Sequence, residues 1–196
     1  MSERTRNAVG VLVGSAVFGA AWWAARQPEV SALEERVERA VNRGPDAVYR
    51  PVYVVMQLGS LGGGLAAGAL LARRDRRTGI ATMVAVTAAW AGSKVVKRST
   101  GRGRPEAHLD GIVVRGAPQR GLGFPSGHAG VATVVALGAA SVLPRAAALA
   151  VAGASASTVL ARVYVGAHLP LDVTGGAAMG LVLGCVAREF VRLRSG

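Results

Sequence analysis

The sequence has a single cysteine, few aromatic residues and a small charged fraction. Cys185 has no second cysteine with which to form an internal disulfide, which excludes a disulfide scaffold. Only 17% of the 196 residues are charged, whereas 51% are hydrophobic and the mean hydropathy is +0.37. This composition excludes a disordered chain and is too apolar for an ordinary soluble domain.

Acidic residues are also scarce, with 11 Asp and Glu against 23 Lys and Arg. The resulting net charge of +12 would favour a nucleic-acid partner in a soluble chain. The apolar excess argues against that class, and we expect no nucleic-acid partner. If the apolar residues form uncharged runs, the basic residues must crowd into short loops, where they orient the chain in a membrane or bind phosphate.

Long uncharged runs predict six membrane-spanning helices in a single domain that covers residues 1–196. About 20 apolar residues cross a bilayer core as a helix. The first run is expected to be a retained helix, because residues 22–26 offer no small-residue cleavage site for a signal peptide. The fold class is therefore all-α, a polytopic bundle of six transmembrane helices. The expected spans are residues 8–25, 51–72, 78–94, 121–144, 146–162 and 169–187.

The segment between the first two spans has the pattern of an amphipathic helix. Its apolar residues recur at helical spacing: Val30, Leu33, Val37 and Val41. Charged residues cover the other side: Glu34, Glu35, Arg36, Glu38 and Arg39. The pattern predicts an interfacial helix that lies on the membrane, and it is equally typical of a solvated connector.

An even number of spans places both termini on one side of the membrane. That side carries 10 of the 23 basic residues and the other side 13, so the positive-inside rule alone does not orient the chain. The loop at residues 73–77 has four arginines in five positions, which favours cytoplasmic termini in a multi-pass protein of the cell membrane.

Three polar clusters fall at span ends on the opposite, extracytoplasmic side. They occupy residues 97–105, 125–128 and 162–172. They are far apart in sequence, but the span topology places them at the same depth in the membrane. We therefore expect them to form one site.

The basic residues of these clusters suit a tetrahedral anion. Lys97, Arg104 and Arg162 can surround a phosphate with charge-assisted hydrogen bonds. Ser126 adds a hydroxyl, and the backbone of Ser126 and Gly127 at a helix N-terminus adds amide donors. The pattern predicts an anion hole for phosphate.

Two histidines and one aspartate complete this chemistry. One histidine can attack phosphorus while the other, His128 or His168, protonates the leaving oxygen. Asp172 lies four residues after His168, one helical turn away, and can fix the tautomer of its ring. No cluster has metal-ligand spacing, so we expect neither a metal nor another cofactor.

Together these motifs resemble the signature of a known family. The three parts are Lys97-x6-Arg104-Pro105, Pro125-Ser126-Gly127-His128 and Arg162-x5-His168-x3-Asp172. In order and spacing they resemble the type 2 phosphatidic acid phosphatase (PAP2) superfamily of membrane phosphatases. The resemblance implies a six-helix membrane fold and a metal-independent reaction through a phosphohistidine.

The resemblance also implies a role for each site residue. It makes His168 the nucleophile, Asp172 its partner and His128 the acid for the leaving group. The family's third motif usually begins Ser-Arg, whereas Ala161 stands here, so one hydroxyl near the phosphate is missing. The phosphate-binding residues would be Lys97, Arg104, Ser126, Gly127 and Arg162.

A site at the mouth of a transmembrane bundle favours a lipid phosphate as the substrate, with membrane lipids around the protein. The family implies phosphatidic acid, phosphatidylglycerophosphate or a polyprenyl phosphate or diphosphate. Two alternatives remain open: a lipid phosphotransferase that uses the same site, and a non-catalytic anion or lipid transporter. The sequence predicts neither the lipid tail nor an oligomeric state.

Overall fold

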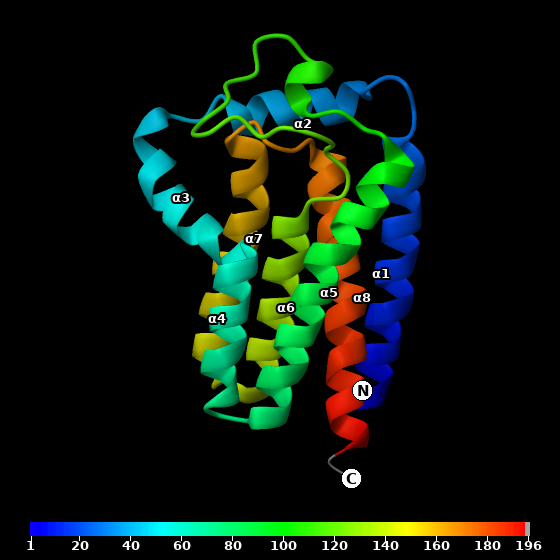
Figure 1. Cartoon of the computed structure of the whole chain (residues 1–196), viewed down its shortest axis with the longest axis vertical. Coiled ribbons are helices and arrows are strands. Elements are labelled where there is room, and N and C mark those ends of the chain that lie inside the picture. Colours follow the sequence, from blue (N-terminus) through cyan, green and yellow to red (C-terminus); the bar gives the residue numbers. More distant parts are fainter. Residues whose placement is uncertain (195–196) are drawn as a thin grey trace.

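The computed structural model describes residues 1–194, and within them all regular structure is helical. The long helices stand side by side along the long axis, and the start of α1 and the end of α8 lie at one end (Figure 1). Helix α2 and the connecting loops cover the other end. The four longest helices are α1 (Glu3–Ala25), α5 (Arg76–Thr100), α7 (Arg145–Tyr164) and α8 (Pro170–Leu193).

These four helices are long and apolar enough to cross a membrane. They lie where spans were predicted but extend further, because the charged residues of their first and last turns fall outside uncharged runs. Helix α5, for example, reaches Thr100 rather than Lys94. Gly101 ends it with a positive φ of 68°, a left-handed conformation that glycine adopts without steric cost.

The second predicted span is broken rather than continuous. Helix α3 (Tyr49–Met56) and helix α4 (Leu61–Ala72) meet at an angle of 65°, joined by the short helix η2 (Gln57–Gly59). The hydroxyl of Ser60 accepts a hydrogen bond from the Gly63 amide at 2.9 Å and so starts α4 anew. The break brings Gly59 against α6, where a Cβ would lie 2.6 Å from the carbonyl oxygen of His128.

Helix α6 (Gly127–Val142) is the central helix of the bundle. The fourth span was predicted to start at residue 121, and that start is wrong. The hydroxyl of Ser126 accepts from the Ala129 amide, so the helix begins after Ser126 and residues 121–126 form a loop. Val131, Val134 and Val135 of α6 pack against Val86 of α5 in the main core. Among the described residues, the four long helices, the broken pair and the shorter apolar helix α6 are consistent with the six passes expected from the sequence.

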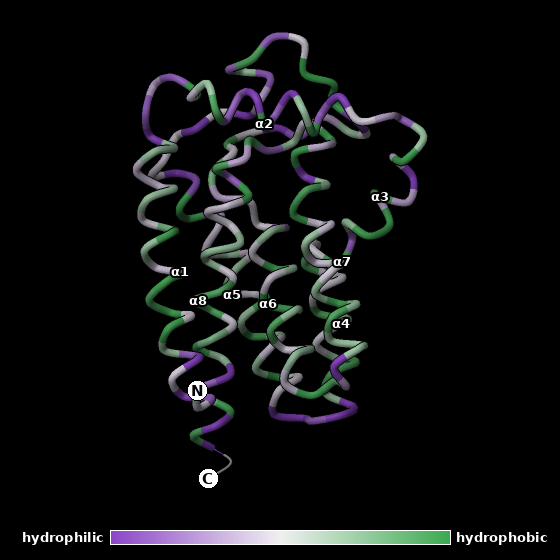
Figure 2. The backbone as a smooth tube through the Cα atoms, turned by 180° about the vertical axis from the view of Figure 1, so that it is seen from behind, coloured by the Kyte–Doolittle hydropathy of each residue, from purple (hydrophilic) through white to green (hydrophobic). Residues whose placement is uncertain are grey.

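The amphipathic segment does form a helix, α2 (Ala32–Asn42), which crosses the end of the bundle as a polar stretch (Figure 2). The helix does not simply turn its apolar residues toward the protein. Glu34 and Glu38 are buried against the protein, while Leu33 and Val37 are 65% and 41% exposed. An amphipathic pattern defines two faces but does not say which one meets the protein. Here specific polar contacts decide it.

One of these contacts fixes the C-terminal end of α2. The side-chain amide of Asn42 donates to the carbonyls of Val113 and Tyr164 at 2.9 and 3.1 Å, and its oxygen accepts from the Val113 amide at 2.8 Å. Arg115 adds hydrogen bonds to the carbonyls of Asn42, Gly44 and Tyr164. The loop after α5, helix α2 and the end of α7 are thus joined into one cover.

Candidate active site

The three polar clusters meet under this cover, at the ends of four helices. The chain reverses between α7 and α8 at Gly166, which has a positive φ of 69°. The amides of Ala167 and His168 both donate to the carbonyl of Arg162 at 3.1 Å. This tight turn places His168, which is buried, directly between the end of α7 and the start of α8.

His168 contacts an acid and a base at once. Its Nδ1 lies 3.4 Å from Oδ2 of Asp172, and its Nε2 lies 2.9 Å from Nη1 of Arg104. A guanidinium can only donate, so Nε2 accepts from Arg104 and the ring proton is on Nδ1, facing Asp172. Burial and the charges of Arg104, Arg162 and Lys97 hold the pKa of His168 well below its usual value. The ring is therefore neutral at pH 7.

Asp172 is fully buried in the first turn of α8. Its Oδ2 accepts from the Leu169 amide at 3.0 Å, which caps the helix, in addition to facing His168. Its backbone carbonyl accepts from the Ser126 amide at 2.8 Å. The starts of α6 and α8 are thereby tied together, so the second and third clusters hold a fixed relation.

The N-terminus of α6 packs closely against its neighbours. A Cβ on Gly127 would lie 2.9 Å from Oγ of Ser93 on α5, so glycine is the residue that fits. Lys97, one turn further along α5, donates from Nζ to the carbonyl of Leu122 at 2.8 Å. The loop before α6 is therefore held over the end of α5 by the same lysine that the sequence assigns to phosphate.

Two buried guanidinium groups have donors left over. Nη1 of Arg162 contacts Sδ of Met56 at 3.1 Å, while its Nε has no hydrogen-bond partner among the described residues. Nε of Arg104 is likewise buried without such a partner. A cavity of about 140 Å³ adjoins Arg162 and is walled by Tyr49 and Tyr53 of α3. Buried donors without partners are costly, and an anion would satisfy them.

Sequence reasoning missed two residues that complete this arrangement. Arg102 donates from Nη2 and Nη1 to both carboxylate oxygens of Glu34, at 2.7 and 3.0 Å, and from Nη1 to Oδ1 of Asp172 at 3.2 Å. Oε1 of Glu34 also accepts from the Leu171 amide at 2.9 Å. Helix α2 is therefore connected to the carboxylate that faces His168. The sequence did offer one signal for this pair. Acidic residues are scarce in this apolar chain, and a buried carboxylate is expected to have a basic partner.

Glu38 lies one turn after Glu34 on the same buried face. It is 0% exposed, and neither carboxylate oxygen has a hydrogen-bond partner among the described residues. Burial, with the nearby negative charges of Asp172 and Glu34, raises the pKa of Glu38 from 4.5 to about 8. Glu38 is thus a neutral acid at pH 7.

This proton makes stability depend on pH in a defined direction. Between about pH 4.5 and 8 the folded protein keeps the Glu38 proton that the unfolded chain has lost, so stability falls as pH rises through this window. Glu38→Gln mimics the neutral acid and has no carboxyl proton to lose. The melting temperature of wild type is therefore expected to fall relative to that of Glu38→Gln between pH 5 and pH 8. Thermal unfolding in detergent measures this difference. The control Glu35→Gln removes a carboxylate from the more exposed side of α2, and an equal trend there would contradict the assignment to Glu38.

Comparison with known proteins agrees with this arrangement. A family model described as the PAP2 superfamily matches residues 78–195. No curated protein sequence matches the chain. A transmembrane PAP2-type phosphatidylglycerolphosphate phosphatase from Bacillus subtilis has 21% identity and a TM-score of 0.76, over 93% of this chain and 96% of that one. LpxE from Aquifex aeolicus has 20% identity and a TM-score of 0.70, over 83% and 98% of the two chains.

At these identities the two structures establish the fold. The family match covers more than half of the chain and includes all three clusters around His168. The chain is therefore a polytopic membrane protein that belongs to the PAP2 superfamily.

Proposed function

We propose that the protein is a membrane phosphatase that hydrolyses a lipid phosphate through a phosphohistidine at His168. The observation that carries the proposal is the position of His168, a neutral imidazole between Asp172 and the guanidinium of Arg104. A nucleophile held next to an orienting carboxylate and an anion-binding cation is the arrangement that phosphoryl transfer to nitrogen requires.

The reaction follows in two steps. Nε2 of His168 attacks phosphorus, and the bond to the leaving oxygen breaks as His128 donates a proton to that oxygen. Arg104 releases Nε2 and donates to the phosphate instead, while Asp172 accepts from Nδ1–H and stabilises the positive ring. In the second step water attacks the phosphohistidine, His128 takes its proton, and inorganic phosphate leaves. The negative phosphate itself favours the protonated form of His128.

The remaining site residues bind the phosphate in this proposal. Lys97, Arg104 and Arg162 neutralise its charge, and Ser126 and Gly127 donate from the N-terminus of α6. Three fixed cations can stabilise the charge of the transition state by electrostatics alone. We therefore propose a reaction without a metal or another cofactor.

The depth of the site supports a lipid substrate. The site lies at the end of a bundle of membrane spans, where a headgroup can reach His168 while its tail stays in the bilayer. One relative of the same fold acts on phosphatidylglycerolphosphate. Phosphatidic acid, phosphatidylglycerophosphate and polyprenyl phosphates are the candidate classes. The arginine-rich loop at residues 73–77 supports cytoplasmic termini, with the site on the extracytoplasmic face of the cell membrane.

The test is phosphate release by the purified full-length protein in detergent, with each candidate lipid and with excess EDTA. We expect hydrolysis without any added acceptor, at a rate that EDTA changes by less than about twofold, because fixed cations serve the role of a metal. A strict requirement for a divalent metal would contradict the mechanism. Release that depends on an added sugar or lipid acceptor would identify a phosphotransferase instead.

A further inference from the structure

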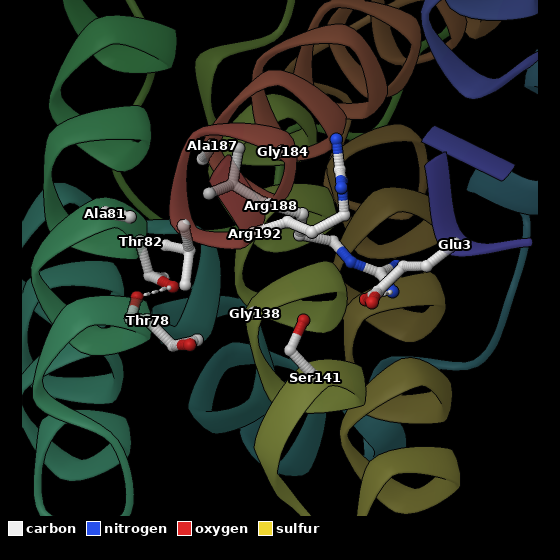
Figure 3. A pocket seen from close by; sticks show the side chains of 12 residues that line it. Glu3, Thr78, Ala81, Thr82, Gly138, Ser141, Gly184, Ala187, Arg188 and Arg192 are labelled. Carbon is white, nitrogen blue, oxygen red and sulfur yellow. Dashed lines mark hydrogen bonds and ion pairs between the residues drawn. The ribbon is translucent and has the colours of Figure 1, made fainter. Parts of the chain in front are cut away.

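Two adjoining hollows lie at the end of the bundle that holds the termini, far from His168. The first is a polar cavity of about 430 Å³ among α1, α5, α6 and α8 (Figure 3). The second is a groove of about 760 Å³ between α5 and α8. The two share Ala81, Ala187 and Val191 as a common wall. The first hollow is polar and the second mainly apolar, and they are neighbours across this wall.

The groove has the character of a site for acyl chains. Exposed apolar side chains line it, among them Ile80, Val84 and Phe190, and Arg77 and Arg194 stand at its terminal end. From Ile80 to Ala88 the groove follows α5 for about 12 Å, which lies within one leaflet of a bilayer core of about 30 Å. Its apolar length therefore matches lipid tails, and its basic end lies where headgroups lie.

The polar cavity supplies the groups that a headgroup needs. Nε of Arg188 is buried without a hydrogen-bond partner among the described residues, and its Nη2 reaches Oε1 of Glu3 only at 3.4 Å. Arg192, in contrast, is held by Glu189 at 2.6 Å. Arg188 therefore keeps donors for an anion.

Hydroxyl side chains complete the cavity, from Thr78, Thr82 and Ser141. Thr82 donates to the Thr78 carbonyl at 2.8 Å, and Ser141 donates to the Leu137 carbonyl at 3.2 Å. Both oxygens keep lone pairs that can accept from hydroxyl groups. The set as a whole fits a headgroup that combines a phosphate with free hydroxyls.

We propose that these hollows bind an anionic phospholipid of the surrounding leaflet, with its phosphate at Arg188 and its tails in the groove between α5 and α8. Charge complementarity selects this occupant, because Arg77 and Arg194 border the apolar groove, and two arginines, Arg188 and Arg192, line the cavity against one carboxylate, Glu3. The site is separate from that of the proposed reaction and does not depend on it.

Native mass spectrometry of the purified protein tests the proposal, by titration with dioleoyl phosphatidylglycerol and with dioleoyl phosphatidylcholine. We expect wild type to bind phosphatidylglycerol at least about tenfold more tightly. Arg188→Gln should reduce that preference at least fivefold, whereas Ala88→Phe should fill the groove and weaken the binding of both lipids. Arg145→Gln is the matched control, since it removes an exposed arginine at the same end of the bundle.

Two results would overturn the proposal. Equal affinity of wild type for the two lipids would show that the hollows have no headgroup preference. Equal losses in Arg188→Gln and Arg145→Gln would show that the preference comes from the diffuse positive charge of this end. Because the wild-type comparison stands without any variant, poor folding of Arg188→Gln would not leave the question open.

Discussion

His168→Ala is expected to lower kcat for lipid phosphate hydrolysis by at least about 10⁴-fold, because the variant has no atom that can form the covalent intermediate. The other site residues have different roles in the proposal: His128 protonates the leaving oxygen, Arg104 and Arg162 only donate, and Asp172 is tied to the Leu169 amide. Retained affinity for the lipid is expected, because the cations proposed to bind its phosphate are unchanged. The measurement is kcat and KM for phosphate release in detergent.

The matched control for this prediction is His108→Ala, which removes an exposed histidine from the loop after α5. Its kcat should stay within about twofold of wild type. Brief exposure of the wild-type protein to a ³²P-labelled lipid phosphate, followed by a base quench, should leave an acid-labile label that His168→Ala lacks. Activity of His168→Ala near the wild-type value would rule out the phosphohistidine mechanism.

The spans, and the meeting of the three polar clusters at one end of the bundle, could be predicted because each depends on local sequence. The length of an uncharged run gives a span, and the spacing of Arg162, His168 and Asp172 places all three at one helix junction. Hydropathy alone does not predict where a helix starts inside an apolar run. At Ser60 and Ser126 a hydroxyl caps a new helix within such a run.

The cover over the site could not be predicted in the same way. Glu34 and Arg102 are 68 residues apart, and no spacing rule relates them. The periodicity of α2 separates charged residues from apolar ones, yet two of the charged residues, Glu34 and Glu38, are buried, and Arg102 and the Leu171 amide satisfy Glu34 there. Contacts between segments far apart in the sequence depend on the tertiary fold, and such contacts decide the orientation of α2.

Arg102 connects α2 to the site through Glu34 and Asp172. Arg102→Ala is expected to lower the free energy of unfolding by about 3–5 kcal/mol, because it leaves the buried carboxylates of Glu34 and Asp172 without their shared cation. Two like charges then face each other across a site in which both side chains are at most 4% exposed. The measurement is thermal unfolding in detergent. The control Arg39→Ala breaks the half-exposed pair with Glu35 on α2 and an exposed hydrogen bond to the Asp110 carbonyl, and should cost less than about 1 kcal/mol.

The double variant Glu34→Gln with Arg102→Met separates packing from positioning. It removes both members of the buried pair, so most of the lost stability should return. Activity should stay low, because Asp172 no longer has the guanidinium that holds Oδ1 while Oδ2 faces His168. A double variant that regains both stability and wild-type kcat would show that Arg102 only stabilises the cover. One that regains stability alone would show that α2 acts through Arg102 to align the carboxylate behind the nucleophile.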